Sequence, residues 1–394
     1  MKVLVASHSY IVELNCEKLR TLAHMGHDVT VVVPKRWNPG GVQNRIVEPE
    51  PRQDGSFRVV PIANLSQNNQ GLLSFGWGIV NLLKTFKPDI IQVEQGSKSL
   101  GYAELITLNR LLGGRAKHLF FTWWNLPYEL KFPLSLLESY NLRHTDGLVV
   151  GNQDGADILK KRGYQGPVRV MPQLGVDETL FRPQKQPQLR QQLSIAADSF
   201  VIGFVGRFVP EKGLLTLFKA LGTLKNLPWT LVLLGRGPLK DELQTQANTL
   251  GIAERIRWIE SVPHNAVPDY ISLMDTLVLP SETTYEFKTL TSVGWKEQFG
   301  HVLIEAMACR VPVIGSDSGE IPYVIDDSGL VFPEGDHTAL ADRLTQLIQQ
   351  PEQQQTLADK GYERAMKHYT NKALATELLA FYQELLGQGG HCYN

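Results

Sequence analysis

The chain has 394 residues, of which 43% are hydrophobic and 20% are charged, and this composition is typical of a folded globular protein. The length exceeds that of an ordinary single domain and suits two domains, each with its own core. The formal net charge is −1, and no polybasic run with interleaved aromatic residues occurs, so we expect no nucleic-acid partner.

Positive charge is concentrated in the first part of the chain. Residues 1–175 contain 20 Lys and Arg against 14 Asp and Glu, whereas the remainder contains 19 against 26. A basic half can attract phosphate groups or an anionic membrane surface. Ordinary scatter of charges explains the same asymmetry, and the sequence does not separate the two explanations.

The cysteines and the apolar stretches both favour a cytoplasmic protein. Cys16, Cys309 and Cys392 are too few and too widely spaced for a disulfide framework or a zinc cluster. The N-terminal MKVLVASHSY is expected to be a first strand rather than a signal peptide, and the longest mostly apolar stretch, 72–83, is too short to cross a bilayer. Any membrane association is therefore expected to be peripheral, at the inner face of the plasma membrane.

The first elements along the chain form a βαβ unit. A buried strand over 3–6 is followed by a helix over 13–23 and by a strand over 29–33, whose β-branched residues suit a parallel sheet covered on both faces. The region 34–69 is rich in Pro, Gly, Asn and Gln and is expected to contain loops with short strands. Further strands are predicted over 90–93, 119–122 and 147–150.

A second α/β series follows a stretch at 181–187 that has the composition of a linker. We therefore predict an α/β protein of two Rossmann-like domains, 1–180 and 181–370, that face each other across a cleft. The last helical pattern, over about 370–390, could close the second domain or cross back to the first. The strands of the second series are predicted over 200–205, 229–234, 256–259, 276–279, 311–314 and 329–332.

The segment 296–315 contains two carboxylates, Glu297 and Glu305, that are eight positions apart. A turn at Phe299-Gly300 followed by a helix from about Val302 would offer free backbone N–H groups and the positive end of a helix dipole, which suit a diphosphate. The two carboxylates could then accept hydrogen bonds from sugar hydroxyls. The plainer alternative is a solvated loop charge and an exposed helix residue.

This segment resembles the E-x7-E element of family 4 retaining glycosyltransferases of the GT-B fold. The VPVIGSDSGEIPYVI sequence that follows it, the Leu279-Pro280-Ser281 tripeptide and the MPQLGVDETLFRP stretch near 171–183 resemble that family as well. The resemblance covers most of the chain and is strongest from about 200 to 335. It implies retaining transfer of a sugar from a UDP- or GDP-type sugar donor, without a cofactor.

Two cations, Arg207 and Lys212, lie in a predicted loop between a strand and a helix. A guanidinium can donate two hydrogen bonds to phosphate oxygens. Together with a nearby ammonium, it would neutralise the charge that develops on a diphosphate as its bond to the sugar breaks. Similar members of the family use this Arg and Lys on the donor diphosphate, which makes Arg207, Lys212 and Glu297 the predicted catalytic residues. Two surface cations near a helix start are the structural alternative.

The remaining donor-side candidates follow predicted strands. Gly235 belongs to a G-x-G-P turn that lacks the third glycine of a dinucleotide fingerprint, and Ser261 and Val262 could lie against the base. Since no D-x-D pair occurs, we predict that no metal is required. The predicted donor site comprises Gly206, Arg207, Lys212, Gly235, Ser261, Val262, Glu297, Phe299, Gly300, His301, Val302 and Glu305.

The acceptor side departs from the family pattern. The usual Gly-Gly turn after the first strand is replaced by a sequence containing His8, and the usual histidine after a later strand is replaced by Trp123-Trp124-Asn125. His118 precedes the predicted strand and is therefore at the wrong end of the sheet. His8, Glu94, Trp124 and Asn125 are the acceptor-side candidates, with structural roles as the alternative. The polar stretch 281–295 exceeds the family's usual spacing and could form a lid.

The resemblance implies a mechanism without a protein nucleophile. Glu297 would hold sugar hydroxyls, Glu305 would hold the ribose hydroxyls, and the leaving diphosphate would take the proton of the acceptor. The expected acceptor is a saccharide or a lipid-linked intermediate of polysaccharide biosynthesis. A nucleotide-sugar epimerase of similar fold and a non-catalytic nucleotide-sugar-binding partner subunit are the alternatives.

Overall fold

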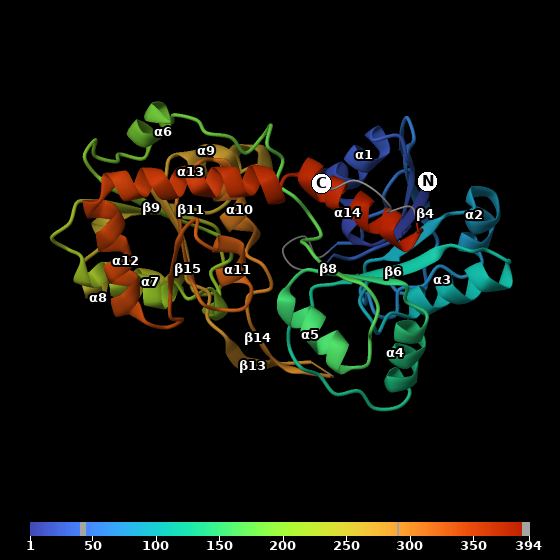
Figure 1. Ribbon diagram of the computed structural model, residues 1–394. Helices are drawn as coiled ribbons and strands as arrows, with labels where there is room; N and C mark the ends of the chain where they lie inside the picture. The colour runs from blue at the N-terminus through green and yellow to red at the C-terminus, as the bar shows by residue number, and fades with distance from the viewer. Residues whose placement is uncertain (40–44, 290, 388–394) are drawn as a thin grey trace. The chain divides into compact units, whose positions relative to one another are not determined.

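The computed structural model describes residues 1–39, 45–289 and 291–387, and they divide into two compact units. The first unit is Met1–Gly175 together with the segment that begins at Asn371, and the second is Val176–Thr370. The division therefore falls a few residues before the boundary at 180 that the sequence suggested. Each unit is built around its own parallel sheet (Figure 1).

The sheet of the first unit has the order β3-β4-β2-β1-β5-β6-β7-β8 and is parallel except where the edge strand β3 pairs with β4. The order reverses between β1 and β5, which makes this the topological switch point of the unit. The strands are β1 (Lys2–Ala6), β2 (Asp28–Pro34), β3 (Arg52–Asp54), β4 (Phe57–Ile62), β5 (Ile90–Val93), β6 (Lys117–Thr122), β7 (Gly147–Val150) and β8 (Val168–Val170).

Helices cover both faces of this sheet, as the unbroken apolar strands require. The C-terminal helix α14 (Asn371–Leu385) packs on one face beside α1 (Glu17–His24), with Leu374, Leu378 and Phe381 in the same core cluster as Val3 of β1 (Figure 1). The other helices of this unit are α2 (Gly78–Phe86), α3 (Leu100–Leu111), α4 (Leu134–Arg143) and α5 (Gln153–Lys161).

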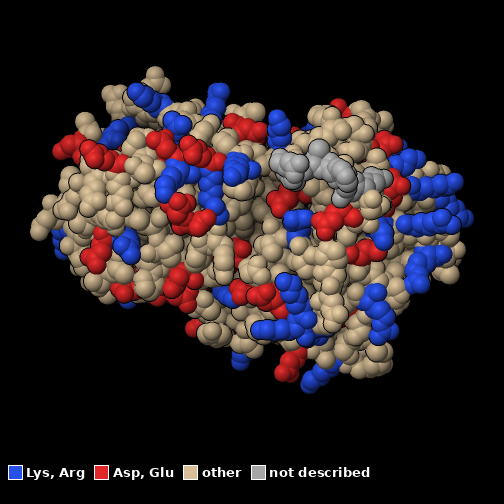
Figure 2. All heavy atoms as spheres, in the orientation of Figure 1, with Lys and Arg blue, Asp and Glu red and all other residues tan. Residues whose placement is uncertain are grey.

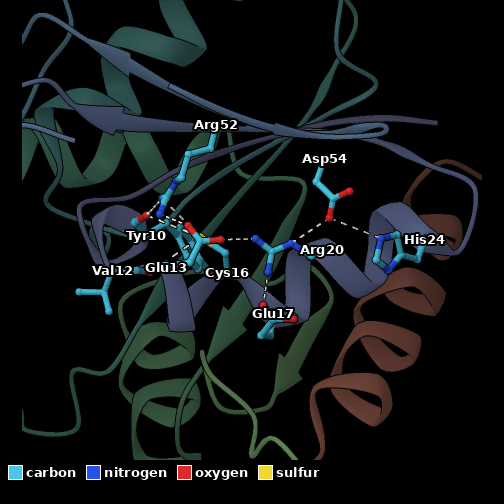
Figure 3. Close-up of polar contacts among 9 residues, drawn as sticks. All are labelled: Tyr10, Val12, Glu13, Cys16, Glu17, Arg20, His24, Arg52 and Asp54. Atoms are coloured by element: carbon cyan, nitrogen blue, oxygen red, sulfur yellow. Dashed lines mark hydrogen bonds and ion pairs between the residues drawn. The ribbon is translucent and has the colours of Figure 1, made fainter. Parts of the chain in front are cut away.

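A network of ion pairs joins the loop after β1 to the edge strand β3 (Figure 3). Arg20 of α1 binds Glu13 and Glu17 and lies 3.3 Å from Asp54, while Arg52 of β3 also binds Glu13. The Arg52 guanidinium donates to the backbone oxygen of Tyr10 at 2.8 Å. The network thereby links the two short 3-10 turns that follow β1, Ser9–Ile11 and Glu13–Cys16, to α1 and β3.

The sheet of the second unit is wholly parallel and has the order β11-β10-β9-β12-β15-β16, with its switch point between β9 and β12. A separate antiparallel hairpin, β13–β14, stands apart from it (Figure 1). The strands are β9 (Phe200–Val205), β10 (Trp229–Leu234), β11 (Ile256–Ile259), β12 (Thr276–Leu279), β13 (Thr284–Lys288), β14 (Val293–Trp295), β15 (Val313–Ser316) and β16 (Leu330–Phe332). The helices are α6 (Pro187–Gln192), α7 (Leu214–Thr223), α8 (Lys240–Leu250), α9 (Val267–Ser272), α10 (His301–Ala308), α11 (Ile321–Ile325), α12 (His337–Gln349) and α13 (Pro351–His368).

Several elements differ from the sequence prediction. The stretch 281–295 carries the β13–β14 hairpin, and His118 is part of β6 rather than preceding it. The short strands expected within 34–69 are β3 and β4. Cys16 and Cys309 are buried free thiols, while Cys392 lies outside the described residues. Among the described residues, no helix combines the length and apolar character needed to cross a membrane.

Candidate active site

The switch point of the second unit brings two of the predicted catalytic residues into contact. Lys212 ends the 3-10 turn Pro210–Lys212 after β9, and Glu297 lies between β14 and α10. The Lys212 ammonium donates a hydrogen bond to the Glu297 carboxylate, although the two residues are 85 positions apart. Because β9 and β12 are neighbours in the sheet, the segments that follow them meet at this edge.

The Lys212–Glu297 pair is largely buried, with side-chain exposures of 15% and 8%. The Ser281 hydroxyl donates to the same carboxylate oxygen at 2.7 Å, and the Lys212 ammonium lies 5.1 Å from the centre of the Trp295 ring. A buried ion pair is stable only when further hydrogen bonds satisfy its remaining atoms, and Ser281 supplies one. The pair therefore holds a fixed ammonium and a fixed carboxylate side by side.

Two glycines allow the backbone to approach closely enough to fix this pair. Gly213 has a φ of +64°, and a Cβ there would lie 1.8 Å from the Pro280 oxygen. Gly319 has a φ of +56°, and a Cβ there would lie 1.9 Å from the Glu297 oxygen. Any side chain at either position would push the loops apart, so the glycines set the position of Lys212 and Glu297.

Arg207 is placed differently from Lys212. Its side chain is 69% exposed, and its guanidinium lies 3.6 Å from Glu211 Oε1. Glu211 is buried, and its second carboxylate oxygen has no hydrogen-bond partner in the described part of the chain. The guanidinium is thus loosely held and accessible, whereas the ammonium is fixed.

The glycine turns after β9 and β10 are packed against each other. A Cβ on Gly235 would lie 1.8 Å from the Gly206 oxygen, and the Gly206 amide donates to Leu234 at 3.0 Å. Ser261, which is exposed, and Val262, which is half-buried, follow β11 along the same edge of the sheet. The structure therefore brings Gly206 and Gly235 together and places Ser261 and Val262 two strands away from β9.

Helix α10 begins at His301 after Gly300, which has a φ of +83° and makes no side-chain cap. Phe299 is buried, with its ring 4.9 Å from that of His301 and 5.7 Å from that of Tyr369, so its side chain is part of the packing around the start of α10. An uncapped helix start of this kind can take up an anion. Val302 is half-buried in the first turn.

Glu305 lies in the second turn of α10 and is half-buried. Within 1–39, 45–289 and 291–387, its carboxylate makes no hydrogen bond or ion pair. Burial raises the pKa of Glu305 to about 7. A carboxylate that is desolvated in this way gains from any hydroxyl donor that a ligand brings to it.

The acceptor-side candidates of the first unit are mostly occupied by structural contacts. Glu94, which follows β5, is 4% exposed and accepts hydrogen bonds from Tyr10 and Gln92 at 2.9 Å and from Gln173 at 2.6 Å. The prediction that it lines a cleft is therefore replaced by a role in the core, because three donors already occupy its oxygens. Asn125 is likewise buried, at 3% exposure.

His8 and Trp124 are more accessible. His8 is half-buried with its ring 4.8 Å from that of Trp37, and burial lowers its pKa to about 4, so it is neutral at pH 7. Its Nδ1 has no hydrogen-bond partner in the described residues. Trp124 is half-buried, and its indole N–H donates to the Leu126 oxygen at 2.6 Å.

Two family models match the chain and together cover most of it. The model of glycosyl transferases group 1 matches residues 185–364, and that of the glycosyl transferase 4-like domain matches residues 16–173. Residues 185–364 thus belong to the glycosyl transferases group 1 family, and residues 16–173 belong to the glycosyl transferase 4-like domain family. Both catalytic-residue candidates that meet at the switch point, Lys212 and Glu297, lie inside the region matched by the first model.

Curated relatives match about half of the chain, and the aligned parts are 25–31% identical to it. D-inositol 3-phosphate glycosyltransferase of Mycobacteroides abscessus is 31% identical over 52% of this chain and 44% of the relative. N-acetyl-alpha-D-glucosaminyl L-malate synthase of Bacillus anthracis is 25% identical over 54% and 52%. A GDP-mannose-dependent phosphatidylinositol monomannoside mannosyltransferase of Mycolicibacterium smegmatis is 29% identical over 52% and 54%. The chain spans about half the length of the curated relatives it matches.

Solved structures of the GT-B fold match nearly the whole chain. Sucrose-phosphate synthase from Thermosynechococcus elongatus superposes with a TM-score of 0.69 at 20% identity, over 98% of this chain and 99% of that one. Anabaena HepE in complex with UDP gives 0.69 at 18% identity, over 98% and 100%. At these identities the match concerns the fold, and it confirms the prediction of a GT-B architecture.

Sequence reasoning missed two residues of the candidate site in the second unit. Ser281 and Trp295 both contact the Lys212–Glu297 pair. Ser281 could have been found as the hydroxyl of the Leu279-Pro280-Ser281 tripeptide directly after β12. Trp295 offered no signal, because its position depends on a hairpin that the sequence did not predict. Within the described residues, no group of three or more His, Cys, Asp or Glu could hold a metal ion.

Proposed function

We propose that the protein is a retaining, metal-independent glycosyltransferase of the hexosyltransferase type that uses a nucleotide-diphosphate sugar. The observation that carries this proposal is the buried Lys212–Glu297 pair at the switch point of the second unit. An ammonium and a carboxylate held together provide one group for a phosphate and one for the hydroxyls of the sugar beside it. The match of residues 185–364 to the glycosyl transferases group 1 model supports the same proposal.

In this proposal the donor diphosphate binds between Lys212, Arg207 and the start of α10. Lys212 has three ammonium hydrogens and donates one to Glu297, so it can bind a phosphate without leaving the carboxylate. The exposed side chain of Arg207 would move away from Glu211, 3.6 Å from it, and bind the diphosphate. These two cations would stabilise the negative charge of the leaving diphosphate, the task that a metal performs elsewhere.

The two carboxylates would position the donor rather than react with it. Glu297 would accept hydrogen bonds from sugar hydroxyls, and Glu305 would accept them from the ribose. In the reaction, the acceptor oxygen forms a bond to the anomeric carbon as the bond from that carbon to the diphosphate oxygen breaks. The acceptor proton passes to the leaving diphosphate on the same face of the sugar, which retains the anomeric configuration.

The acceptor that we propose is a hydroxyl of a saccharide or of a lipid-linked intermediate. The names of three relatives specify inositol 3-phosphate, L-malate and a phosphatidylinositol mannoside, which are anionic compounds or lipids. On the face drawn in Figure 2, Lys and Arg side chains gather around α2 of the first unit. A peripheral contact with the anionic cytoplasmic face of a membrane is part of this proposal, because such a face attracts basic surfaces.

Thermal unfolding of the full chain with a panel of UDP- and GDP-sugars tests the proposal. We expect one nucleotide class to raise the melting temperature, since a ligand that binds the native state stabilises it. Chromatography of the same mixtures with saccharide acceptors should then detect a free nucleoside diphosphate, with and without EDTA. No stabilisation by any nucleotide sugar would contradict donor binding. Conversion of the donor sugar without release of a nucleoside diphosphate would identify an epimerase instead.

A further inference from the structure

A pocket of about 320 Å³ lies at the amino ends of two neighbouring strands of the first sheet, β6 and β7. Lys117 begins β6 and Asp146 directly precedes β7, and both residues line the pocket. Arg110 and Arg143, from the last turns of α3 and α4, line it as well. The acceptor-side candidates follow strands at the opposite, carboxyl edge of the sheet, so this pocket is separate from them.

Positive charge prevails in this pocket. Four cations and a single carboxylate line it: Arg110, Arg115, Lys117, Arg143 and Asp146. The carboxylate of Asp146 is already occupied, because Lys117 lies 3.0 Å from one oxygen and the backbone N–H of His118 donates to the other at 2.9 Å. The three arginines are exposed, and their side chains form no ion pair or hydrogen bond with the described residues. The pocket therefore has an excess of positive charge that an anion would neutralise.

The helix ends beside the pocket do not account for these arginines. Cations in the last turn of a helix often bond its final carbonyl oxygens. At the end of α3, however, backbone N–H groups of residues 112–114 donate to oxygens within residues 108–110. At the end of α4, those of residues 144–145 donate to oxygens within residues 141–142. Arg115 belongs to neither helix. The three guanidinium groups are therefore available to a ligand.

A buried histidine in the wall of the pocket has an unused donor. His118 is 5% exposed, and its Nε2 accepts a hydrogen bond from the side-chain amide of Asn109 at 3.1 Å. Burial lowers the pKa of His118 to about 4, so the ring is neutral at pH 7 and carries its single proton on Nδ1. This Nδ1 has no hydrogen-bond partner in the described part of the chain. A buried N–H without an acceptor is costly, and an anion in the pocket would bring one.

We propose that this pocket, which we call the amino-edge pocket, binds a phosphate group. A guanidinium donates two parallel hydrogen bonds to phosphate oxygens, so three arginines around one pocket suit this ligand. A free phosphate and the headgroup of an anionic lipid would supply the same chemistry. The inference goes beyond the proposed function, because none of the residues proposed to bind the donor or the acceptor lines this pocket.

Amine labelling of the full chain, read residue by residue by mass spectrometry, locates the bound phosphate. The probes are inorganic phosphate, sodium chloride at equal ionic strength, and phosphatidylcholine vesicles with or without phosphatidic acid. We expect a phosphate-bearing probe to slow the labelling of Lys117 but not that of Lys84, an exposed lysine of α2 that does not line the pocket. Protection by inorganic phosphate would identify a free phosphate as the ligand. Protection only by vesicles that contain phosphatidic acid would identify a lipid headgroup.

Three results of the labelling would overturn the inference. The first is that neither phosphate-bearing probe protects Lys117, and the second is that Lys84 is protected equally. The third is equal protection by sodium chloride, which would show that the probes act by screening charge alone.

Calorimetric titration of variants with the protecting probe gives an independent measurement. Arg115→Ala and Arg143→Ala should each weaken binding by about tenfold, the effect of losing a charge-assisted hydrogen bond. Both side chains are exposed, so the variants should fold as the wild type does, which urea denaturation checks. The control Lys84→Ala removes one exposed cation of the same unit and should bind as the wild type does. Wild-type affinity in both arginine variants would contradict the inference.

A variant of the second unit separates this pocket from the proposed donor site, which also offers cations to a phosphate. Lys212 belongs to the other unit, so the protection of Lys117 should persist in Lys212→Ala. Loss of that protection would place the phosphate outside the amino-edge pocket and overturn the inference. The result does not bear on the proposed function, which is tested by nucleotide binding and transfer.

Discussion

The sheets of both units reverse their strand order at a switch point beside their first strand, β1 or β9, but polar groups at the two switch points are used differently. In the second unit, the segments after β9 and β12 bring together an ammonium and a carboxylate, Lys212 and Glu297. In the first unit, the segments after β1 and β5 bring together Tyr10 and Glu94, and the carboxylate is closed off by Gln92 and Gln173 as well. Topology therefore decides where polar groups meet, and the partners of each group decide whether a ligand can still bind there.

The first way to test this comparison is Lys212→Ala. We expect kcat to fall by about 10²-fold or more, because the variant loses a cation that stabilises the developing charge of the diphosphate. Steady-state transfer assays measure it. The matched control is Lys240→Ala, which breaks the exposed pair with Glu260 in the same unit and should leave kcat unchanged. A kcat near the wild-type value in Lys212→Ala would contradict the conclusion that the switch point of the second unit, unlike that of the first, binds a ligand.

The second test is Glu94→Ala in the first unit. The change leaves three buried donors without their acceptor, so the free energy of unfolding should fall by about 3 kcal/mol. Urea denaturation measures this value, and binding of the nucleotide to the folded variant should persist. Glu13→Ala, which removes a surface carboxylate of the same unit, should change the stability by about 1 kcal/mol or less. If Glu94→Ala is as stable as the wild type and loses only its affinity for the acceptor, then Glu94 belongs to the acceptor site and its structural role is contradicted.

The third test, Glu305→Gln, should act in opposite directions on affinity and stability. Nucleotide affinity should fall by about tenfold, the effect of replacing a charged acceptor of the ribose hydroxyls. The folded pKa of about 7 lies above the ordinary value of 4.5, so the stability of the wild type without ligand falls as the pH rises from about 4.5 through 7. Glu305→Gln removes this penalty, and its melting temperature without ligand should exceed that of the wild type at pH 8 but not at pH 4. Equal melting temperatures at pH 8 would show that Glu305 is not desolvated.

Buried strands could be predicted from the sequence more readily than exposed ones. The apolar runs at 200–205 and 229–234 coincide with β9 and β10, because strands buried on both faces need apolar residues at every position. The hairpin strand β13 is exposed along most of its length, so no burial pattern marks it in the sequence. The amphipathic stripe of α14 predicts a helix but does not say which unit it packs on.

The residues of the candidate site also differ in whether the sequence alone could identify them. Lys212, Glu297 and Glu305 could be named because they lie in short motifs that resemble those of a known glycosyltransferase family. The role of Glu94 could not, because its partners Tyr10 and Gln173 come from positions 84 and 79 residues away. Contacts between distant segments are set by packing, which a single sequence does not display.

A crystal structure of the full chain with UDP or GDP tests the central claim most directly. The account predicts the diphosphate within hydrogen-bond distance of Lys212 Nζ and of the backbone amides at the start of α10, with the ribose hydroxyls on Glu305. Nucleotide density at any other part of the molecule, or a diphosphate that leaves the Lys212–Glu297 pair untouched, would contradict it.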